Sequence, residues 1–380
     1  MRILRIVPLP PDYIGGLPLY CKNLSLNLAK RKGIKCDILA PDLLNKQKKV
    51  EYLSESIKII YKKKIIFPKK HFLYPVANIF NFLKNNYKDY DIIHAHGYYF
   101  STTTQCALLR KICTFPFILH IHGGIQTPYN PVSNMSENLQ LLIKQKIFDR
   151  VVGRFHIESS DKLISVSKPD LFTIVQKYQV NKENCYYIPN AVDISKFKRI
   201  KNIERKYITL MATRLSYVKG VDIFIKIIKD LYKNNKNLKF LIIGSGSLRN
   251  LVLEAQKKLP ITYYPSYPYE KIQEVYNMSK LILITSRTEG VPNIIYESFA
   301  CETPVISSNV GGISNVISPN INGILFDINN YKTIVRSILN LISDENKLKE
   351  YGRNGQKLIE EEYSWEKITE KVYSIYKTML

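Results

Sequence analysis

Residues 281–317, LILITSRTEGVPNIIYESFACETPVISSNVGGISNVI, contain the pattern that decides the fold. The segment opens with a short apolar run, continues through a polar loop that holds Glu289, and predicts a helix that starts at Pro292. A second apolar run, 304–308, ends in a pair of glycines. The order of strand, loop, helix and strand is typical of a parallel sheet. In such sheets, ligands bind where the carboxyl ends of strands meet the N-termini of helices.

Two carboxylates of this segment are placed to bind a polar ligand beside a phosphate. The N-terminus of a helix favours anions such as a diphosphate. Glu297 lies in the predicted helix eight positions after Glu289, and a helical side chain leans toward the N-terminus of its helix. Both carboxylates can therefore face one ligand and accept hydrogen bonds from its hydroxyl groups. The alternative is that Glu297 only complements the helix dipole and Glu289 is a solvated loop charge.

Length and composition predict a two-domain globular chain. The chain has 380 residues, 45% of them apolar, which is comfortable for two domains of ordinary size. No run approaches the roughly 18 apolar residues of a membrane span. The first residues are broken by proline too early for a signal peptide, so we expect a first strand there. The six cysteines form no C-x-x-C pair, which favours a reducing, cytoplasmic compartment over a disulfide framework.

The rest of the chain alternates apolar runs with helical patterns, which predicts an α/β protein with doubly wound parallel sheets. The runs are nearly all apolar, as expected for strands that are covered by helices on both faces. The predicted strands are 2–8, 36–41, 91–97, 115–123, 162–167, 185–190, 207–215, 239–246, 261–265, 281–286, 304–308 and 323–327.

We expect two Rossmann-like domains and a separate final helix. The first domain is predicted at 1–190 and the second at 191–362, with a polar linker at about 190–206. An apolar stripe at helical spacing predicts a last helix at 363–380. A first helix is expected after Gly16, with Gly33 stopping it.

The segment 281–317 resembles the E-x7-E signature of retaining, nucleotide-sugar-dependent glycosyltransferases of family 4, which have the GT-B fold. The resemblance implies two Rossmann-like domains that face a central cleft, with the last helix crossing back to the first domain. It implies acceptor binding in the first domain and nucleotide-sugar binding in the second. Glu289 would contact the sugar as a catalytic residue and Glu297 the ribose. The residues implied to surround the donor between them are Gly290, Val291, Pro292, Asn293 and Ile294.

A second motif, ATRLSYVKG at 212–220, resembles the G-R-x-(x)3-K-G element of the same family. It departs from that element by carrying Ala212-Thr213 where a glycine is usual. The resemblance implies that Arg214 and Lys219 hold the diphosphate, one as a planar fork and the other as a point charge. The alternative is two exposed cations in a very basic protein.

The first domain contributes two further motifs. Gly15-Gly16 matches the glycine pair from which related enzymes offer backbone N–H groups to the donor; Gly16 is the stronger candidate. HIHGG at 120–124 resembles the element whose second histidine lies near the transferred sugar, which implies a catalytic role for His122. His96, in DIIHAHG, is expected to support the cleft wall. Gly244 and Tyr267 are further candidates near the nucleotide.

Metal sites and dinucleotide sites are not predicted. The pairs His94/His96 and His120/His122 each share a strand face, but no carboxylate or cysteine accompanies them at ligand spacing. Asp89-Tyr90-Asp91 precedes its strand, at the wrong end for a ligand, and is interpreted as structural. IIGSGSLRN at 242–250 lacks the third glycine of a dinucleotide fingerprint. We therefore expect no metal and no cofactor besides the donor substrate.

The chain has a net charge of +24, and the largest local excess of positive charge lies at 46–70. This segment contains nine lysines and only two acidic residues, Glu51 and Glu55, with aromatic residues between them. Such a segment suits an anionic membrane surface, nucleic acid or plain solvent. Peripheral contact with the cytoplasmic face of a membrane is our working hypothesis.

The predicted function is transfer of a hexosyl group from a UDP-, GDP- or similar nucleotide-diphospho-sugar to a hydroxyl acceptor with retention of configuration. The expected acceptor is a glycan or lipid-linked saccharide of cell-surface glycan biosynthesis. One alternative is a sugar-nucleotide 2-epimerase of the same architecture. The other is a non-catalytic, basic nucleic-acid-binding protein, although no recognition helix or RNA-binding signature is found. Two positions depart from the family pattern. Glu302 stands where the family commonly has glycine. Ser314-Asn315 stands where an acidic residue is frequent.

Overall fold

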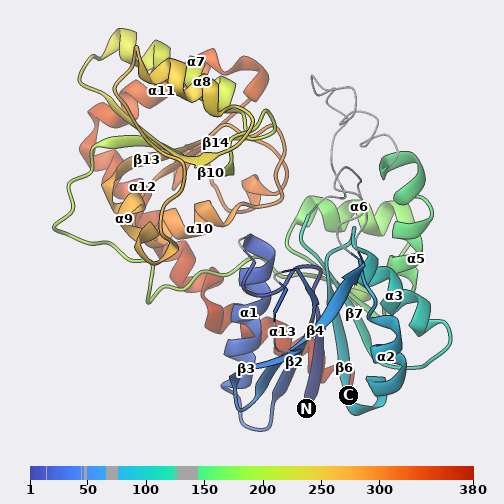
Figure 1. The fold of residues 1–380 in the computed structure, drawn as a ribbon. Helices are drawn as coiled ribbons and strands as arrows, with labels where there is room; N and C mark the ends of the chain where they lie inside the picture. The colour runs from blue at the N-terminus through green and yellow to red at the C-terminus, as the bar shows by residue number, and fades with distance from the viewer. Residues whose placement is uncertain (14, 44, 47–48, 66–75, 124, 126–143) are drawn as a thin grey trace. The chain divides into compact units, whose positions relative to one another are not determined.

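The computed structural model of the protein describes residues 1–13, 15–43, 45–46, 49–65, 76–123, 125 and 144–380. The chain forms two compact units (Figure 1). The first unit comprises Met1–Asn190 together with Trp365–Leu380, and the second unit comprises Ala191–Ser364. The chain therefore leaves the first unit once and returns to it once.

The first unit is built on one sheet with strand order β3-β4-β2-β1-β6-β7-β8-β9. Its strands are parallel except β3 and β5, which run antiparallel to β4. The strands are β1 (Arg2–Ile6), β2 (Lys35–Asp42), β3 (Val50–Ser54), β4 (Ile57–Ile65), β5 (Val76–Ala77), β6 (Ile92–His96), β7 (Phe117–Ile121), β8 (Lys162–Ser165) and β9 (Cys185–Tyr187). The helices are α1 (Gly16–Ala29), α2 (Phe80–Asn86), α3 (Ser101–Arg110), α5 (Val152–Glu158), α6 (Lys168–Tyr178) and α13 (Trp365–Lys377).

The two faces of this sheet differ in chemistry. Leu4 and Ile6 of β1 and Ile93 of β6 pack in an apolar cluster with residues of α2 and α3. Because side chains alternate along a strand, the residues between them, Arg5 and His94, lie on the opposite face. That face is covered by α1 and α13, which lie side by side (Figure 1). A polar layer is therefore buried between the sheet and these two helices.

The second unit has an all-parallel sheet with strand order β12-β11-β10-β13-β14-β15, and helices cover both of its faces (Figure 1). The strands are β10 (Tyr207–Arg214), β11 (Lys239–Ser245), β12 (Ile261–Tyr264), β13 (Ser279–Ile284), β14 (Val305–Ser308) and β15 (Gly323–Phe326). The helices are α7 (Val221–Asn234), α8 (Arg249–Gln256), α9 (Ile272–Met278), α10 (Asn293–Ala300), α11 (Lys332–Ser343) and α12 (Glu345–Leu358).

The predicted fold class is confirmed: both units are doubly wound α/β structures, and every predicted strand is present. The hairpin of β3 and β4 was not predicted. It lies within the lysine-rich segment 46–70, where charged residues mask the strand pattern. The predicted stop of the first helix at Gly33 is wrong, because α1 ends at Ala29 and Gly33 occupies the turn before β2.

The stretch 191–206 is not a free linker, because it packs against the second unit. Val192 and Phe197 are buried in that unit's core. The side-chain carbonyl of Asn277 accepts hydrogen bonds from the Arg199 guanidinium and from the Ile200 backbone N–H. Polar side chains hold this segment in place, and apolar periodicity does not reveal such contacts.

The end of α10 explains one departure from the family pattern. Glu302, which stands where glycine is common, has a positive φ of 53°, a left-handed conformation that glycine adopts without strain. Arg205 donates hydrogen bonds to the carbonyl groups of Cys301 and Glu302. These bonds satisfy carbonyl groups that a helix end leaves unpaired, and they stabilise the strained turn.

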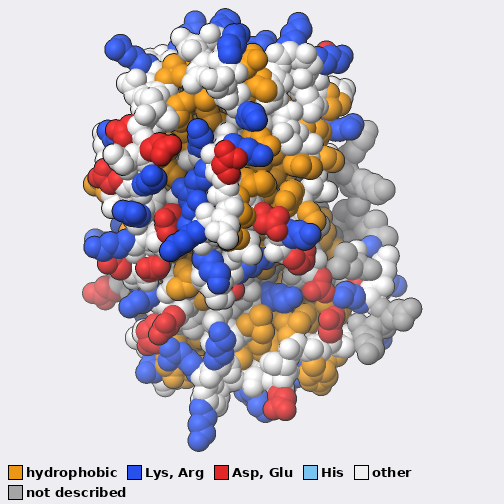
Figure 2. Space-filling view, turned by 90° about the vertical axis from the view of Figure 1, so that its left-hand side faces the viewer, with side chains coloured by type: hydrophobic (Ala, Val, Ile, Leu, Met, Phe, Trp, Pro, Cys, Tyr) orange, Lys and Arg blue, Asp and Glu red, His pale blue; other side chains and the backbone are white. Residues whose placement is uncertain are grey.

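Basic and acidic side chains are interspersed on the surface in view in Figure 2, with no large region of a single sign. Among the described residues, no helix combines the length and the apolarity that a bilayer crossing requires.

Candidate functional site

Three loops of the second unit meet at the carboxyl ends of β10, β13 and β14. Gly220, at the N-terminus of α7, has φ +64°, and a Cβ there would lie 1.6 Å from the carbonyl oxygen of Thr285. Gly311 has φ +58°, and a Cβ there would lie 1.9 Å from the carbonyl oxygen of Glu289. The backbone N–H of Gly312 donates to the carbonyl of Gly290 at 2.8 Å. Only glycine permits both close approaches, so these glycines fix the loop that carries Glu289.

Lys219 and Glu289 form an ion pair within this set of loops. The Ser286 hydroxyl donates a second hydrogen bond, of 2.7 Å, to the same Glu289 oxygen. The Glu289 side chain is only 11% exposed and that of Lys219 25% exposed. The structure therefore brings together two residues that lie 70 positions apart in the sequence. In this structure each carries a charge that the other neutralises.

Arg287 contacts the same loops and stabilises them. The sequence analysis did not predict a role for this residue. Its two terminal nitrogens each donate to one Asp222 carboxylate oxygen at 2.8 Å. Its guanidinium also stacks 3.5 Å from the centre of the Tyr217 ring and donates to the Tyr217 carbonyl. The bidentate pair ties the first turn of α7 to the loop after β13, and the Tyr217 contacts tie in the loop before α7. No sequence spacing links these positions.

Arg214 ends β10 at the same edge of the sheet. Its side chain is exposed, and no ion pair joins it to any described residue. Gly244, at the end of β11, has φ +141°, and a Cβ there would lie 1.7 Å from the Ala212 carbonyl oxygen. Gly244 is thus needed for packing between strand ends. Tyr267 donates a 3.2 Å hydrogen bond to Glu274.

Glu297 lies in α10, which begins directly after Pro292, as predicted. Its carboxylate accepts a hydrogen bond from the Tyr276 hydroxyl. Burial raises the pKa of Glu297, although the Tyr276 hydrogen bond and the charge of Lys196 act in the opposite direction. The Lys196 ammonium lies 3.3 Å from the centre of the Tyr269 ring. The sequence offered no signal for Tyr276, Tyr269 or Lys196, because all three lie outside the segment that carries Glu297.

The remaining candidates lie in the first unit. Gly15 precedes α1 and Gly16 is its first residue. His122 follows β7, and its Nε2 lies 2.9 Å from Nδ1 of His96. The resemblance implies acceptor binding in this unit, of which residues 124 and 126–143 lie outside the described residues.

Three buried histidines of the first unit, His94, His96 and His120, have ligand atoms within 4.8 Å of one another. These residues do not fit a metal ion well. Arg5 lies beside them, with Nη1 at 2.7 Å from His96 and 3.2 Å from His94. A fixed positive charge in contact with two of three ligands opposes a second cation.

The D-x-D sequence at 89–91 lies at the N-terminal end of β6. The Asp91 carboxylate accepts a 2.7 Å hydrogen bond from the backbone N–H of Arg2, and the Tyr90 hydroxyl donates to Asp37 at 2.8 Å. These contacts are structural: they link the start of β6 to β1 and, beyond β1, to β2.

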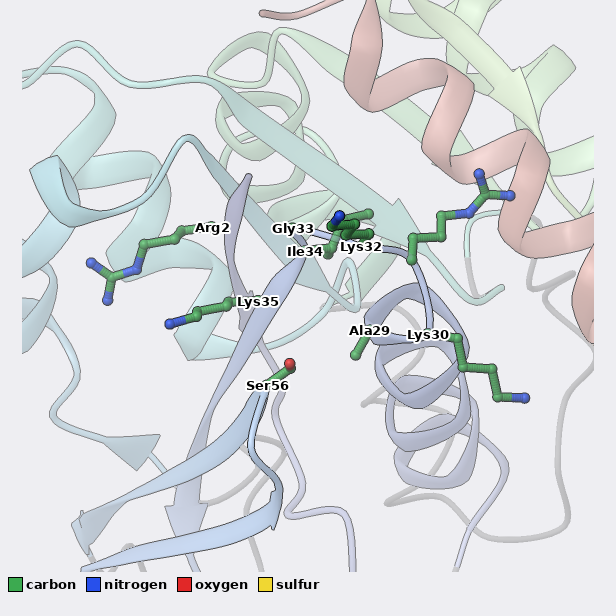
Figure 3. Close-up of a pocket in the computed structure, with 9 residues that line it drawn as sticks. Arg2, Ala29, Lys30, Lys32, Gly33, Ile34, Lys35 and Ser56 are labelled. Carbon is green, nitrogen blue, oxygen red and sulfur yellow. The ribbon is translucent and has the colours of Figure 1, made fainter.

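A basic pocket of the first unit lies at the amino ends of β1 and β2. Its lining includes Arg2, Lys30, Lys32, Lys35 and Ser56. Figure 3 shows Arg2 and Lys35 extending to one side of the pocket and Lys30 to the other. Because these cations diverge, they do not form a single anion site.

Comparisons with known proteins identify the family. A model described as "Glycosyl transferases group 1" matches residues 193–358, and one described as "Glycosyltransferase Family 4" matches residues 14–196. The chain therefore belongs to the family 4, group 1 glycosyltransferases. An uncharacterized glycosyltransferase of Methanocaldococcus jannaschii is 29% identical, over 97% of this chain and 95% of the relative. The capsular polysaccharide biosynthesis glycosyltransferase CapM of Staphylococcus aureus is 30% identical over 50% of this chain and 53% of its own.

Solved structures support the same fold. Sucrose-phosphate synthase from Thermosynechococcus elongatus has a TM-score of 0.81 at 19% identity, with 100% of this chain and 98% of that chain covered. HepE of Anabaena, in complex with UDP, has a TM-score of 0.73 at 16% identity, with both chains fully covered. At such low identity the likeness establishes the GT-B fold alone.

Gly311→Ala tests the packing of the Glu289 loop. We expect the variant to lose about 3 kcal/mol of unfolding free energy, because left-handed strain adds to a backbone clash. Asn320→Ala is the matched control in the same unit, since Asn320 has φ +62° and is exposed. It should cost no more than about 1 kcal/mol. Urea denaturation measures both; equal losses would contradict the packing argument.

Glu297→Gln tests the environment of Glu297 through the pH dependence of stability. Because its pKa is raised in the folded state, the folded protein binds this proton more tightly than the unfolded chain. The contribution of Glu297 to stability therefore falls as pH rises above the usual carboxyl range. We expect the variant to gain stability relative to the parent as pH rises from 5 to 8.

Urea denaturation at both pH values measures this difference. Glu254→Gln is the control, because Glu254 is 68% exposed. A relative stability of Glu297→Gln that is independent of pH would contradict the assignment.

Proposed function

We propose that the protein transfers a hexosyl group from a nucleoside-diphosphate sugar to a hydroxyl acceptor, with retention of the anomeric configuration. Family membership supports glycosyl transfer. The observation that carries the finer proposal is the charged group at the ligand edge of the second sheet. There, Glu289 is held by Lys219 and Ser286 in the loop that leads into α10.

In this proposal the diphosphate is bound by cations and by backbone amides, and no metal is needed. Arg214 and Lys219 neutralise the charge that develops on the leaving group. The N-terminus of α10 adds the positive end of a helix dipole, which favours an anion. The amide of Gly16 is the first unit's contribution.

The sugar and ribose are bound by carboxylates. Glu289 accepts hydrogen bonds from the sugar hydroxyls, and Glu297 accepts them from the ribose. His122 orients the sugar or the acceptor. The acceptor oxygen forms a bond to the anomeric carbon of the sugar. At the same time, the bond between the anomeric carbon and the phosphate oxygen breaks. The departing phosphate oxygen takes the acceptor's proton on the same face of the sugar. Catalysis then comes from positioning and electrostatics without a protein nucleophile.

The Lys219–Glu289 pair adds a step that the sequence did not suggest. Because the two charges neutralise each other in this structure, a bound donor competes for both. A diphosphate oxygen attracts Lys219, and sugar hydroxyls replace the ammonium as donors to Glu289. An intact nucleotide sugar provides a partner for Lys219 and a partner for Glu289. The nucleotide alone would attract Lys219 but leave Glu289 without a hydrogen-bond donor in its place. This difference favours binding of the intact nucleotide sugar.

The family comparisons give no support to the two alternatives, an epimerase and a nucleic-acid binder. An epimerase of the same architecture would convert a nucleotide sugar with no acceptor present. Product analysis without acceptor distinguishes that reaction from transfer. UDP-sugars are the first donors to test, since HepE is described with UDP and with UDP-glucose.

Lys219→Met and Glu289→Gln test the proposed donor site. A thermal-shift screen with UDP-, GDP- and ADP-sugars first identifies the donor. We then expect each variant to lose at least about 100-fold in kcat/KM for transfer or donor hydrolysis, the scale of one lost electrostatic contact to the transition state. Lys229→Met, on the exposed face of α7, makes the same charge change away from the site and should keep full activity. Near-normal turnover by both site variants would contradict the assignment.

We propose further that the first unit contacts an anionic membrane surface through the segment 46–70, of which residues 47, 48 and 66–70 lie outside the described residues. Lys46 and Lys58 pair with acids of the same unit, so they are poorly placed for this role. Tyr52 and Val50 on the edge strand β3 are exposed, and so is the adjacent Lys49. An exposed aromatic residue beside a lysine suits the headgroup region.

Sedimentation with vesicles tests this contact. We expect the protein to bind vesicles that contain an anionic lipid at low salt, and to dissociate as salt screens the lysines. Tyr52→Ser with Lys49→Gln should weaken binding about tenfold. Lys257→Gln, in the second unit, removes an exposed lysine as control. Absence of binding at low salt would end the membrane proposal.

A further inference from the structure

Arg5 is an unusual residue in the polar layer of the first unit, because its side chain is completely buried and no described carboxylate pairs with it. A buried charge is tolerated only when its hydrogen-bonding capacity is used. Its Nε donates to Ser25 at 2.8 Å, and its Nη2 donates to the Tyr376 hydroxyl at 3.4 Å. Nη1 contacts His94 and His96, at 3.2 and 2.7 Å. The guanidinium is therefore enclosed by neutral groups.

These contacts determine which nitrogen of each ring carries the proton. A guanidinium can only donate hydrogen bonds, so Nε2 of His96 must accept from Arg5. A neutral His96 then carries its proton on Nδ1. That nitrogen lies 2.9 Å from Nε2 of His122 and must donate to it. His122 accepts at Nε2, so its own proton lies on Nδ1.

A second series of hydrogen bonds starts at Arg5 and runs through Tyr376 to His94. The Tyr376 hydroxyl accepts from Arg5 and lies 2.6 Å from Nδ1 of His94. Because Arg5 also points at this nitrogen, Nδ1 of His94 accepts and Tyr376 donates. All of these hydrogen bonds are directed away from the guanidinium, which is the one group in the network that cannot reverse its role.

The rings stay neutral, as this network requires. Burial lowers the pKa of His94, His96 and His120 well below the usual value. Burial, followed by the charge of Arg5, lowers the pKa of His122 to about 3. His122 is the one member of this stack that is partly exposed, so it is the ring that can meet a ligand.

We propose that Arg5 is a positioning residue that sets the tautomer of His122, so that this ring offers Nδ1–H to a bound ligand. The identity of that ligand, a sugar or acceptor hydroxyl, depends on the proposed function. The tautomer itself does not. A fixed donor suits a hydroxyl oxygen and removes the cost of selecting one of two tautomers on binding.

Nitrogen NMR of the full-length protein labelled with [15N]histidine tests the tautomer without any activity. The chain has six histidines, and His→Gln variants assign the rings. We expect His122 to show a protonated Nδ1 and an unprotonated Nε2 in the unmodified protein at neutral pH. A protonated Nε2, or a charged ring, would overturn the proposal, whether or not transferase activity is found.

Two variants separate the role of Arg5 from general stability. Arg5→Met should give His122 a mixture of tautomers and lower kcat/KM about tenfold, the order expected for one misdirected hydrogen bond. Tyr376→Phe also removes a hydrogen bond from Arg5 but leaves the His96 branch intact. It should keep both the tautomer and the activity.

Arg5→Lys, which preserves a cationic donor, should restore the Nδ1–H form at least in part. If Arg5→Met does not fold, His96→Phe interrupts the same path with Arg5 in place and should release the tautomer of His122. An unchanged tautomer in every folded variant of Arg5 and His96 would show that Arg5 does not set it.

Discussion

Close backbone packing at the carboxyl ends of β10, β13 and β14 is the constraint on which the candidate site depends. Gly220 and Gly311 allow neighbouring loops to approach the carbonyl groups of Thr285 and Glu289 at distances that no Cβ would permit. Arg287 then ties these loops together through Asp222 and Tyr217. The polar residues at this edge can be presented accurately because the backbone beneath them has little freedom.

The two units neutralise or accommodate a cation in different ways: Lys219 is partly exposed, and Arg5 is completely buried. In the second unit, Lys219 is neutralised by Glu289, an acid that is also a ligand candidate. In the first unit, Arg5 has no such acid and distributes its hydrogen bonds over neutral rings and hydroxyls. In the proposed function, the first arrangement responds to an incoming anion, because the ion pair can be exchanged. The second is fixed, because a guanidinium can neither lose its proton nor accept one.

Sequence patterns predicted the sheets well and the contacts of the site only in part. Apolar runs and glycine pairs are local signals, so β13, α10 and the loop of Glu289 could be located. The pairing of Arg287 with Asp222 could not, because it joins positions brought together only by folding. Strands β3 and β4 were missed because lysines on an edge hairpin hide its alternation. Arg5 was overlooked because a single cation in an apolar strand carries no motif.

The packing of residues 191–206 against the second unit determines where the chain passes from one unit to the other. Val192 pairs with Ser364 in a parallel bridge, and its N–H donates to the Tyr363 carbonyl at 3.0 Å. The chain crosses between units next to these two residues, after Asn190 and before Trp365. Both crossings thus leave the second unit at one place. The second unit thus anchors both connecting strands of backbone itself, by the bridge and the hydrogen bond of Val192.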